Sequence, residues 1–198
     1  MRGGGWGAVK GTTLNYVRGI VKPKAFLNEA GLYEYAVKAL GRHIRTEMEL
    51  RRLMHARVEP GPGGDEVMGA VLTRLKERGY LDDRSYAETY SRLRKENDKF
   101  GQRRVRQALR QKGVSAAVVD KTLEETYAST DEEKLARQYL ERKRIGKPED
   151  EKQTARVMRR LVAAGFSTGV IYKILRQWDV REESLTALDS AGDELTEE

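Results

Sequence analysis

The sequence predicts an all-α protein of three tandem three-helix repeats. Apolar residues recur at helical spacing, and no stretch shows the alternation of a half-buried strand. Three times, a leucine precedes a glycine by four residues, and an apolar residue and a second apolar helix follow. Charged residues make up 35% of the 198 residues and hydrophobic ones 38%, which favours thin helical packing over one thick core. The repeated pairs are Leu75 and Gly79, Leu109 and Gly113, and Leu161 and Gly165.

The clearest of these junctions is the segment RLKERGYLDDRSYAETY, at positions 74–90. Gly79 is expected to take the left-handed conformation that commonly ends a helix. Tyr80 and Leu81 are then expected to fold back onto the core. Asp82 and Asp83 offer side-chain oxygens to the free N–H groups of the next helix, which predicts a cap.

The first repeat is expected to begin with a helix over residues 31–43. A second helix begins at Thr46, which forms a capping box with Glu49. The glycine- and proline-rich stretch 58–64 predicts a loop, and Asp65 is expected to cap the third helix. The predicted inward residues are Tyr33, Ala36, Val37, Leu40, Leu50, Leu53, Met54, Val67, Val71, Leu72 and Leu75.

In the second repeat, the fourth helix is expected to run to about Lys95 and the stretch 97–101 to form a short loop. The fifth helix covers residues 102–112, and Ser115 caps the sixth, which ends near Tyr127.

In the third repeat, Thr130 and Glu133 predict a second capping box at the start of the seventh helix. The stretch 146–150 breaks the pattern. The eighth helix then runs to Ala164, and Ser167 or Thr168 caps the ninth.

Charge divides the chain. Positions 1–28 carry five basic residues and no acid, whereas 181–198 carry seven acids and one base. The tail is therefore net −6 and the first 180 residues are net +13. A basic body indicates a polyanionic partner. The predicted domains are a flexible basic arm (1–30), three repeats (31–81, 82–128 and 129–180) and a disordered acidic tail (181–198).

Several classes of protein are not favoured. The chain has no cysteine, no apolar stretch of membrane-spanning length and no signal peptide, so a cytoplasmic protein is expected. His43 and His55 have no carboxylate at ligand spacing, so no metal or other cofactor is expected. Asp82 and Asp83 are neighbours at a helix start and do not face each other as a catalytic pair would. The sequence offers no positive case for an enzyme.

The basic residues are more informative. On a helical wheel of residues 102–112, Val105, Ala108 and Leu109 lie on one side and Arg103, Arg106 and Arg110 on the other. The eighth helix repeats this division, and guanidinium groups fork well onto phosphate or carboxylate oxygens. These basic stripes predict a binding surface for anions. Its candidate residues are Arg94, Lys95, Arg103, Arg104, Arg106, Arg110, Arg142, Lys143, Arg144, Arg156, Arg159 and Arg160. The candidate turn and cap residues are Gly79, Asp82, Asp83, Gly101, Gly113 and Gly165.

Four segments resemble the RecX family of recombinase regulators in order and spacing: ELRRLM, VLTRLKERGYLDDRSYAETY, FGQRRVRQALRQKGV and ARVMRRLVAAGF. The resemblance covers about positions 31–178 and excludes the arm and the tail. It implies three tandem three-helix repeats in an elongated, curved, right- or left-handed stack. It also implies a non-enzymatic protein that binds the RecA filament on single-stranded DNA. Such a protein restrains ATP turnover, strand exchange and the coprotease activity that triggers the SOS response.

The partners that this resemblance implies are RecA and single-stranded DNA, with weaker binding to duplex DNA, no membrane and no need for a dimer. Two alternatives stay open. A duplex-binding helix–turn–helix protein would read bases, for which only Gln102, Gln107 and Gln111 stand near the stripe. A helical scaffold for a purely protein partner would bind with little salt dependence.

Overall fold

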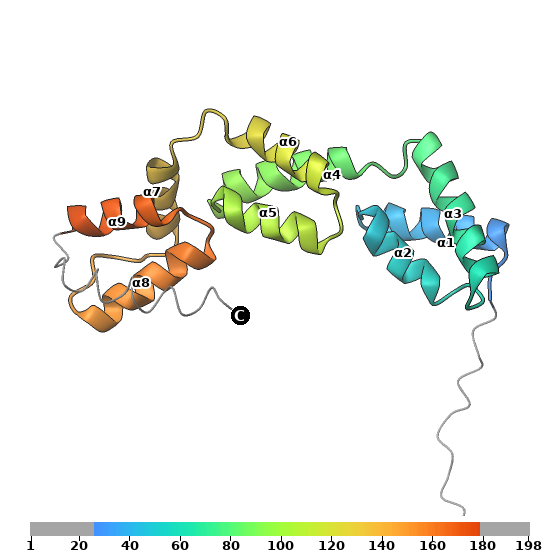
Figure 1. Cartoon of the computed structure of the whole chain (residues 1–198), viewed down its shortest axis with the longest axis horizontal. Helices are drawn as coiled ribbons and strands as arrows, with labels where there is room; N and C mark the ends of the chain where they lie inside the picture. Colours follow the sequence, from blue (N-terminus) through green and yellow to red (C-terminus); the bar gives the residue numbers. More distant parts are fainter. Residues whose placement is uncertain (1–25, 179–198) are drawn as a thin grey trace, which may run out of the picture.

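The computed structural model describes residues 26–178, and this part of the chain is helical and contains no strand (Figure 1). The prediction of an all-α protein built of three-helix repeats is confirmed. The helices are α1 (Glu29–Arg42), α2 (Glu47–His55), α3 (Pro62–Glu77), α4 (Asp83–Leu93), α5 (Gln102–Gln111), α6 (Ala116–Tyr127), α7 (Glu132–Arg142), α8 (Glu151–Ala163) and α9 (Thr168–Gln177). A five-residue π-helix, η1 (Arg94–Asp98), extends α4.

The first bundle consists of α1, α2 and α3, and its helices follow from local sequence signals with one exception. The capping box is present: the Thr46 side chain accepts from the Glu49 N–H, and the Glu49 side chain accepts from the Thr46 N–H. The predicted loop over 58–64 is wrong at its end, because α3 already begins at Pro62 and its N-cap is Gly61. Proline suits the first helical position, where its missing N–H would have no partner. Asp65 therefore lies in the first turn of α3 and is not its cap.

The core of this bundle also differs in detail from the prediction. Leu32 and Met68 are not among the predicted inward residues, but they are fully or almost fully buried. Tyr33 is only partly buried, and the Arg74 guanidinium lies 4.3 Å from the centre of its ring. A tyrosine at the edge of a helical stripe can bury its ring under an arginine and keep its hydroxyl group in water.

The turn between α3 and α4 has the predicted chemistry. Gly79 has a φ of +69°, and the N–H of Tyr80 donates to the Leu75 carbonyl at 2.9 Å, which ends α3 in a Schellman motif. Leu81 is buried as expected, but Tyr80 is 54% exposed, so that part of the prediction is wrong. Asp82 caps α4, since its side chain accepts from the N–H groups at positions 84 and 85.

The second bundle ends its first helix differently from the prediction. Residues 94–98 continue α4 as the π-helix, so the predicted loop over 97–101 is shortened and begins at Lys99, which has a φ of +58°. Ser115 is the N-cap residue of α6, as predicted, but its side chain makes no capping hydrogen bond.

The third bundle corrects a second cap. Asp131, not Thr130, caps α7, because its carboxylate accepts from the Lys134 N–H at 3.0 Å. Glu133 forms ion pairs with Arg137 and Lys173 in place of the predicted capping box. Ser167 is the N-cap of α9, and both its N–H and its hydroxyl donate to Glu132.

Each bundle buries its own apolar cluster, and each cluster comes from three consecutive helices. The phase of the repeat is visible in the cores: Val119 and Leu123 of α6 are fully buried, as are Ile171 and Leu175 of α9. Phe100 packs against the second and third clusters and links these two bundles. The predicted boundaries between the repeats, at 81/82 and 128/129, stay predictions.

At both junctions between bundles, the N-cap residue of one helix donates a hydrogen bond to the C-cap carbonyl of another. At the first, the hydroxyl of Thr46, the N-cap of α2, donates to the carbonyl of Lys112, the C-cap of α5, at 2.6 Å. At the second, the N–H of Gly101, the N-cap of α5, donates to the carbonyl of Ala164, the C-cap of α8, at 2.9 Å. The middle helix of each bundle is α2, α5 or α8. The end of one middle helix therefore meets the start of the middle helix in the preceding bundle, and this contact stacks the bundles in a fixed orientation.

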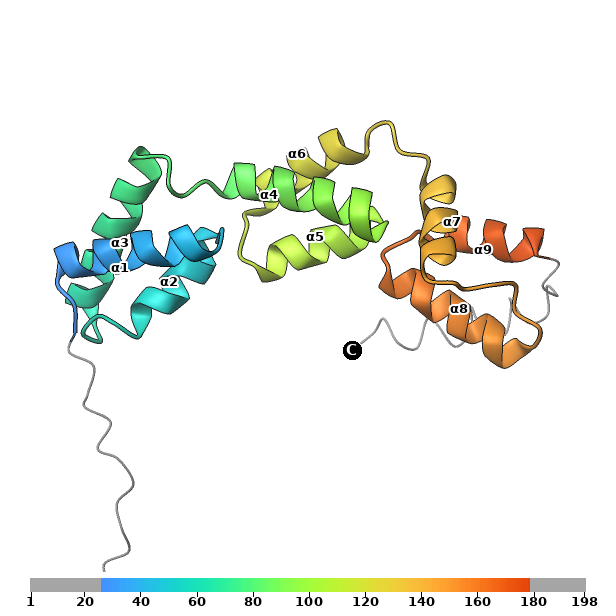
Figure 2. The same cartoon turned by 180° about the vertical axis from the view of Figure 1, so that it is seen from behind.

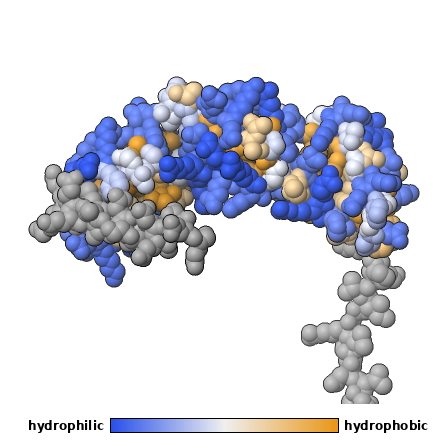
Figure 3. Space-filling model, in the orientation of Figure 1, coloured by the Kyte–Doolittle hydropathy of each residue, from blue (hydrophilic) through white to orange (hydrophobic). Residues whose placement is uncertain are grey.

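The described residues form an elongated arch rather than a sphere. Figures 1 and 2 show the three bundles in a row, with α2, α5 and α8 along the same lower edge in both views. Figure 3 shows a mainly hydrophilic face, on which apolar residues appear as small separate patches. The stacking of one unit on the next thus presents three middle helices along one side of the molecule.

Candidate functional site

The middle helices carry most of the predicted basic residues, so the lower edge of the arch is the candidate functional surface (Figure 1). In α5, Val105 and Leu109 face the core and are almost completely buried. Arg103 and Arg104 are exposed near the start of the helix, beside the junction with the third bundle. The N–H of Arg103 donates to the Gly165 carbonyl at 3.3 Å, so the turn before α9 fixes the position of this end of the stripe.

The other two arginines of the α5 stripe, Arg106 and Arg110, have a carboxylate partner within the second bundle. Asp120 of α6 lies 3.3 Å from Nε of Arg106 and 4.0 Å from a terminal nitrogen of Arg110. The first contact is an ion pair without hydrogen-bond geometry, since the buried Nε of Arg106 has no hydrogen-bond partner. Asp120 is not among the residues predicted from the sequence, because periodicity within α5 cannot reveal a partner on another helix. These two arginines can still turn their remaining N–H groups outward, because about a third to a half of each side chain is exposed.

Arg94 and Lys95 are held inside the second bundle. A 2.7 Å hydrogen bond from Arg94 to Asp98 raises the pKa of the guanidinium, and Arg94 also lies over the Tyr90 ring. Lys95 donates to the Thr126 carbonyl at 2.7 Å. The structure therefore places both residues at contacts that stabilise the bundle, apart from the α5 stripe.

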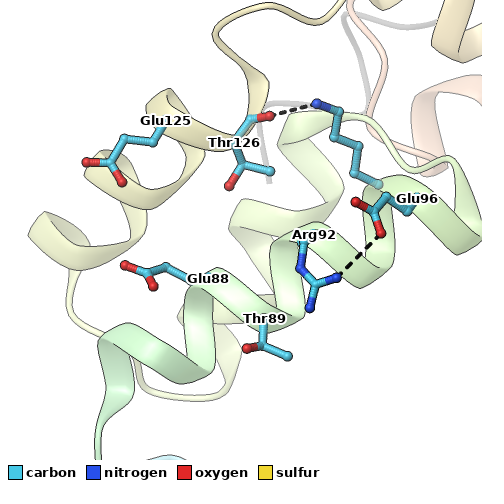
Figure 4. A pocket seen from close by; sticks show the side chains of 7 residues that line it. Glu88, Thr89, Arg92, Glu96, Glu125 and Thr126 are labelled. Carbon is cyan, nitrogen blue, oxygen red and sulfur yellow. Dashed lines mark hydrogen bonds and ion pairs between the residues drawn. The ribbon is translucent and has the colours of Figure 1, made fainter.

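The opposite side of the second bundle is not basic. A groove between α4 and α6 is lined by three glutamates, Glu88, Glu96 and Glu125, together with Arg92 and Lys95 (Figure 4). Arg92 lies 3.7 Å from Glu96 and is the partner of that carboxylate. With three carboxylates and two cations, this groove repels a polyanion, so the second bundle has one basic edge and one acidic groove.

The third bundle carries the densest group of cations. Arg156, Arg159 and Arg160 are exposed along α8. Arg142, Lys143 and Arg144 follow one another at the end of α7 and are also exposed. None of these six side chains has an ion pair with a carboxylate of residues 26–178. They differ in this respect from Arg106 and Arg110.

The predicted turn and cap residues lie at the ends of helices, and several of them contact the neighbouring bundle. Gly113 and Gly165 have φ values of +82° and +89° at the ends of α5 and α8. Asp83 does not cap its own helix, because it accepts from the N–H of Glu47 at the start of α2 at 2.8 Å. Its half-buried position raises the pKa of this carboxyl group through desolvation. The Gly101 backbone lies directly against Gly165, which leaves no room for a side chain.

Within residues 26–178, no group of three His, Cys, Asp or Glu side chains is placed to hold a metal ion. None of the helices in this region is both long and apolar enough to cross a bilayer.

Fold and surface together define an all-α helical-repeat protein with a basic edge. A family model described as the second three-helix domain of RecX matches residues 82–123. The regulatory protein RecX of Mycolicibacterium vanbaalenii is 35% identical over 129 residues, a match that covers 64% of this chain and 68% of that protein. The regulatory protein RecX of Pseudomonas entomophila is 31% identical over 148 residues, which cover 73% and 90% of the two chains.

Solved structures agree with this fold. The crystal structure of RecX from Lactobacillus salivarius superposes with a TM-score of 0.60 at 18% identity, and the match covers 76% of this chain and 96% of that one. A second crystal structure of a regulatory protein RecX gives a TM-score of 0.59 at 24% identity, over 75% and 71% of the two chains. The chain belongs to the RecX family, whose members in these comparisons are named as regulatory proteins.

Proposed function

We propose that this protein is a non-enzymatic inhibitor of the RecA recombinase that binds the RecA filament on single-stranded DNA. In this role it restrains ATP turnover, strand exchange and SOS coprotease activity, and so modulates DNA repair and recombination in the cytoplasm. The observation that carries the proposal is the alignment of α5 and α8, with their arginines, along one edge of an arched RecX-family body.

The geometry suits a long polyanionic partner. A filament on DNA presents phosphates over many subunits, and an elongated arch can contact more of them than a compact domain of the same size. Arg103 and Arg104 on α5, and the cations of α8, face solvent and can fork onto phosphate oxygens. Basic side chains of this kind position a protein on nucleic acid without reading its sequence.

The proposed mechanism is steric. The arch lies along the filament groove, with its basic edge against DNA phosphates and acidic recombinase residues. It then blocks the incoming duplex and hinders the subunit motions that ATP turnover needs. The stacked junctions support this proposal, because hydrogen bonds between backbone and cap groups hold each unit against the next.

The test is DNA-dependent ATP hydrolysis by the cognate RecA on single-stranded DNA, with this protein titrated in. Inhibition at or below one protein per recombinase subunit is expected, and no inhibition at excess would contradict the proposal. Alanine at Arg103, Arg106 and Arg110 should weaken inhibition while helicity stays unchanged. A matched control replaces Arg84, Arg92 and Lys121, which removes the same charge from α4 and α6. Equal loss in both variants would show that net charge, not the α5 stripe, matters.

The dependence of binding on salt concentration distinguishes this proposal from its alternatives. Binding should weaken as salt rises, because each phosphate contact releases counterions. A scaffold for a protein partner alone would show little salt dependence. A helix–turn–helix protein would bind one duplex sequence tightly without recombinase, and a gel shift with duplex DNA tests that alternative.

A further inference from the structure

A basic hollow of about 450 Å³ lies between α8 and the connection that leads to it from α7. Four of its lining residues are cations: Arg144, Lys147, Arg156 and Arg160. No aspartate or glutamate lines it. Arg144, Arg156 and Arg160 were predicted as basic-stripe residues, and the concave shape of the site was not predicted.

The chain builds this hollow with specific backbone geometry. Arg144 has a φ of +53°, which is uncommon for a residue with a side chain. Its N–H donates to the Glu141 carbonyl at 2.9 Å, and the N–H of Ile145 donates to the Leu140 carbonyl at 2.9 Å, so α7 closes in a Schellman motif. Pro148 is buried and anchors the connection that follows. The backbone thus turns Arg144 toward α8.

On the other wall, Arg156 and Arg160 are four residues apart on α8. Side chains at this spacing lie one above the other on the same helical face, with about 6 Å between their Cβ atoms. Buried Val157 ties this face to the core of the third bundle. Two guanidinium groups from a packed helix therefore face a third from the turn.

The three arginines of the hollow are not paired with carboxylates of the described chain. Arg144, Arg156 and Arg160 have no ion pair with any carboxylate of residues 26–178. By contrast, Arg137 of α7 lies 2.8 Å from Glu133, and Arg106 and Arg110 share Asp120. Like charges brought together without a counter-charge repel one another, so an anion in this hollow would be stabilised.

We propose that this hollow binds two neighbouring phosphates of one nucleic-acid strand. This rests on the proposed function and assigns a defined part of the DNA contact to the third bundle. Guanidinium groups form forked, charge-assisted hydrogen bonds with phosphate oxygens. Arg144, Arg156 and Arg160 together carry enough charge and N–H donors to hold two neighbouring phosphodiester groups. The site does not read bases, because arginines aimed at the backbone carry no sequence information.

The first experiment measures binding of the full chain to a ten-nucleotide oligothymidylate by fluorescence anisotropy at several salt concentrations. R156A/R160A should bind about tenfold more weakly and lower the slope of log K against log salt by about 1.4, since each lost contact with a single strand contributes about 0.7. The matched control, K121A/K134A, removes two exposed charges from α6 and α7, outside the hollow and outside the basic stripes, and should change binding much less. Equal effects of the two variants would overturn the proposal, as would unchanged binding by R156A/R160A.

A second experiment distinguishes the source of the anion. Oligothymidylate, pyrophosphate and a glutamate-rich peptide are each titrated into the labelled protein, and the arginine side-chain Nε–H signals are followed by NMR. The proposal expects oligothymidylate to shift the signals of Arg144, Arg156 and Arg160. If the acidic peptide shifts these signals and oligothymidylate does not, the hollow binds protein and the proposal is wrong. Oligothymidylate bound in the hollow without any inhibition of RecA would overturn the proposed function and leave this site standing.

Discussion

Thr46 connects a helix cap to a junction between two bundles, and its replacement should measure how strongly that junction stabilises the fold. The residue is completely buried. Its hydroxyl accepts from the Glu49 N–H at 3.2 Å and donates to the Lys112 carbonyl at 2.6 Å. Valine at this position keeps the volume and removes both hydrogen bonds.

The expected cost is the sum of two effects. Loss of an N-cap hydrogen bond costs about 1 kcal/mol. The partly buried carbonyl of Lys112 also loses its hydrogen bond from Thr46, which costs about a further 1–2 kcal/mol. For a chain of this size each kcal/mol lowers the melting temperature by about 2–4 °C, so T46V should melt about 5–10 °C below the wild type.

The assay is thermal and urea unfolding followed by far-UV circular dichroism. T46S keeps both hydrogen bonds and should stay close to the wild type. S115A is the matched control, because Ser115 is also an N-cap residue but its side chain makes no capping hydrogen bond. If T46V and S115A unfold within about 1 °C of each other, the reasoning about this junction is refuted.

Two further predictions concern the turns and the third bundle. G165A should destabilise the protein by at least about 2 kcal/mol more than G79A in urea unfolding. Both glycines have positive φ, but a Cβ at Gly165 would collide with the backbone of Arg104 in the second bundle. Equal costs would contradict the close approach. Hydrogen bonds from Lys173 and Arg137 lower the pKa of Glu133 to about 2. The folded state therefore favours the carboxylate, and its stabilising effect is complete above about pH 4.5 and is lost as the pH falls toward 2. E133Q should lie below the wild type in melting temperature at pH 6 and converge with it near pH 2, and a gap that is independent of pH would argue against this pair.

Local sequence signals predicted the parts of the fold that depend on neighbouring residues. The capping box at Thr46, the left-handed Gly79 and the Asp82 cap each involve groups within five residues of one another. The chemistry of such short segments is nearly independent of the rest of the chain. The order of the helices followed because each one starts or ends with a signal of this kind.

The misses arise where several residues compete for one role or where the partner is distant. Asp131 and Thr130 could both cap α7, and the aspartate does so. Asp83 looked like a local cap, but the neighbouring bundle brings the N–H of Glu47 to it. In the same way, Asp120 comes to Arg106 only when α6 packs beside α5.

The candidate site was predictable as a list of cations and not as a shape. Periodicity placed Arg156 and Arg160 on one face of α8. It could not place Arg144 opposite them, because that depends on a left-handed residue with a side chain. Sequence rules assign such a conformation to glycine by default.

The repeated junction distinguishes the starts of the three middle helices, α2, α5 and α8. The starts of α2 and α5 are each covered by the next unit, whose C-cap carbonyl accepts a hydrogen bond there. The start of α8 is closed by its own residue, since the Asp150 carboxylate accepts from the Gln153 N–H at 2.7 Å. Thr46 combines both kinds of contact, because its hydroxyl accepts from the Glu49 N–H of its own helix and donates to the following unit. The start of α8 is thus held by groups of its own segment, whereas the starts of α2 and α5 also bind the unit that follows them.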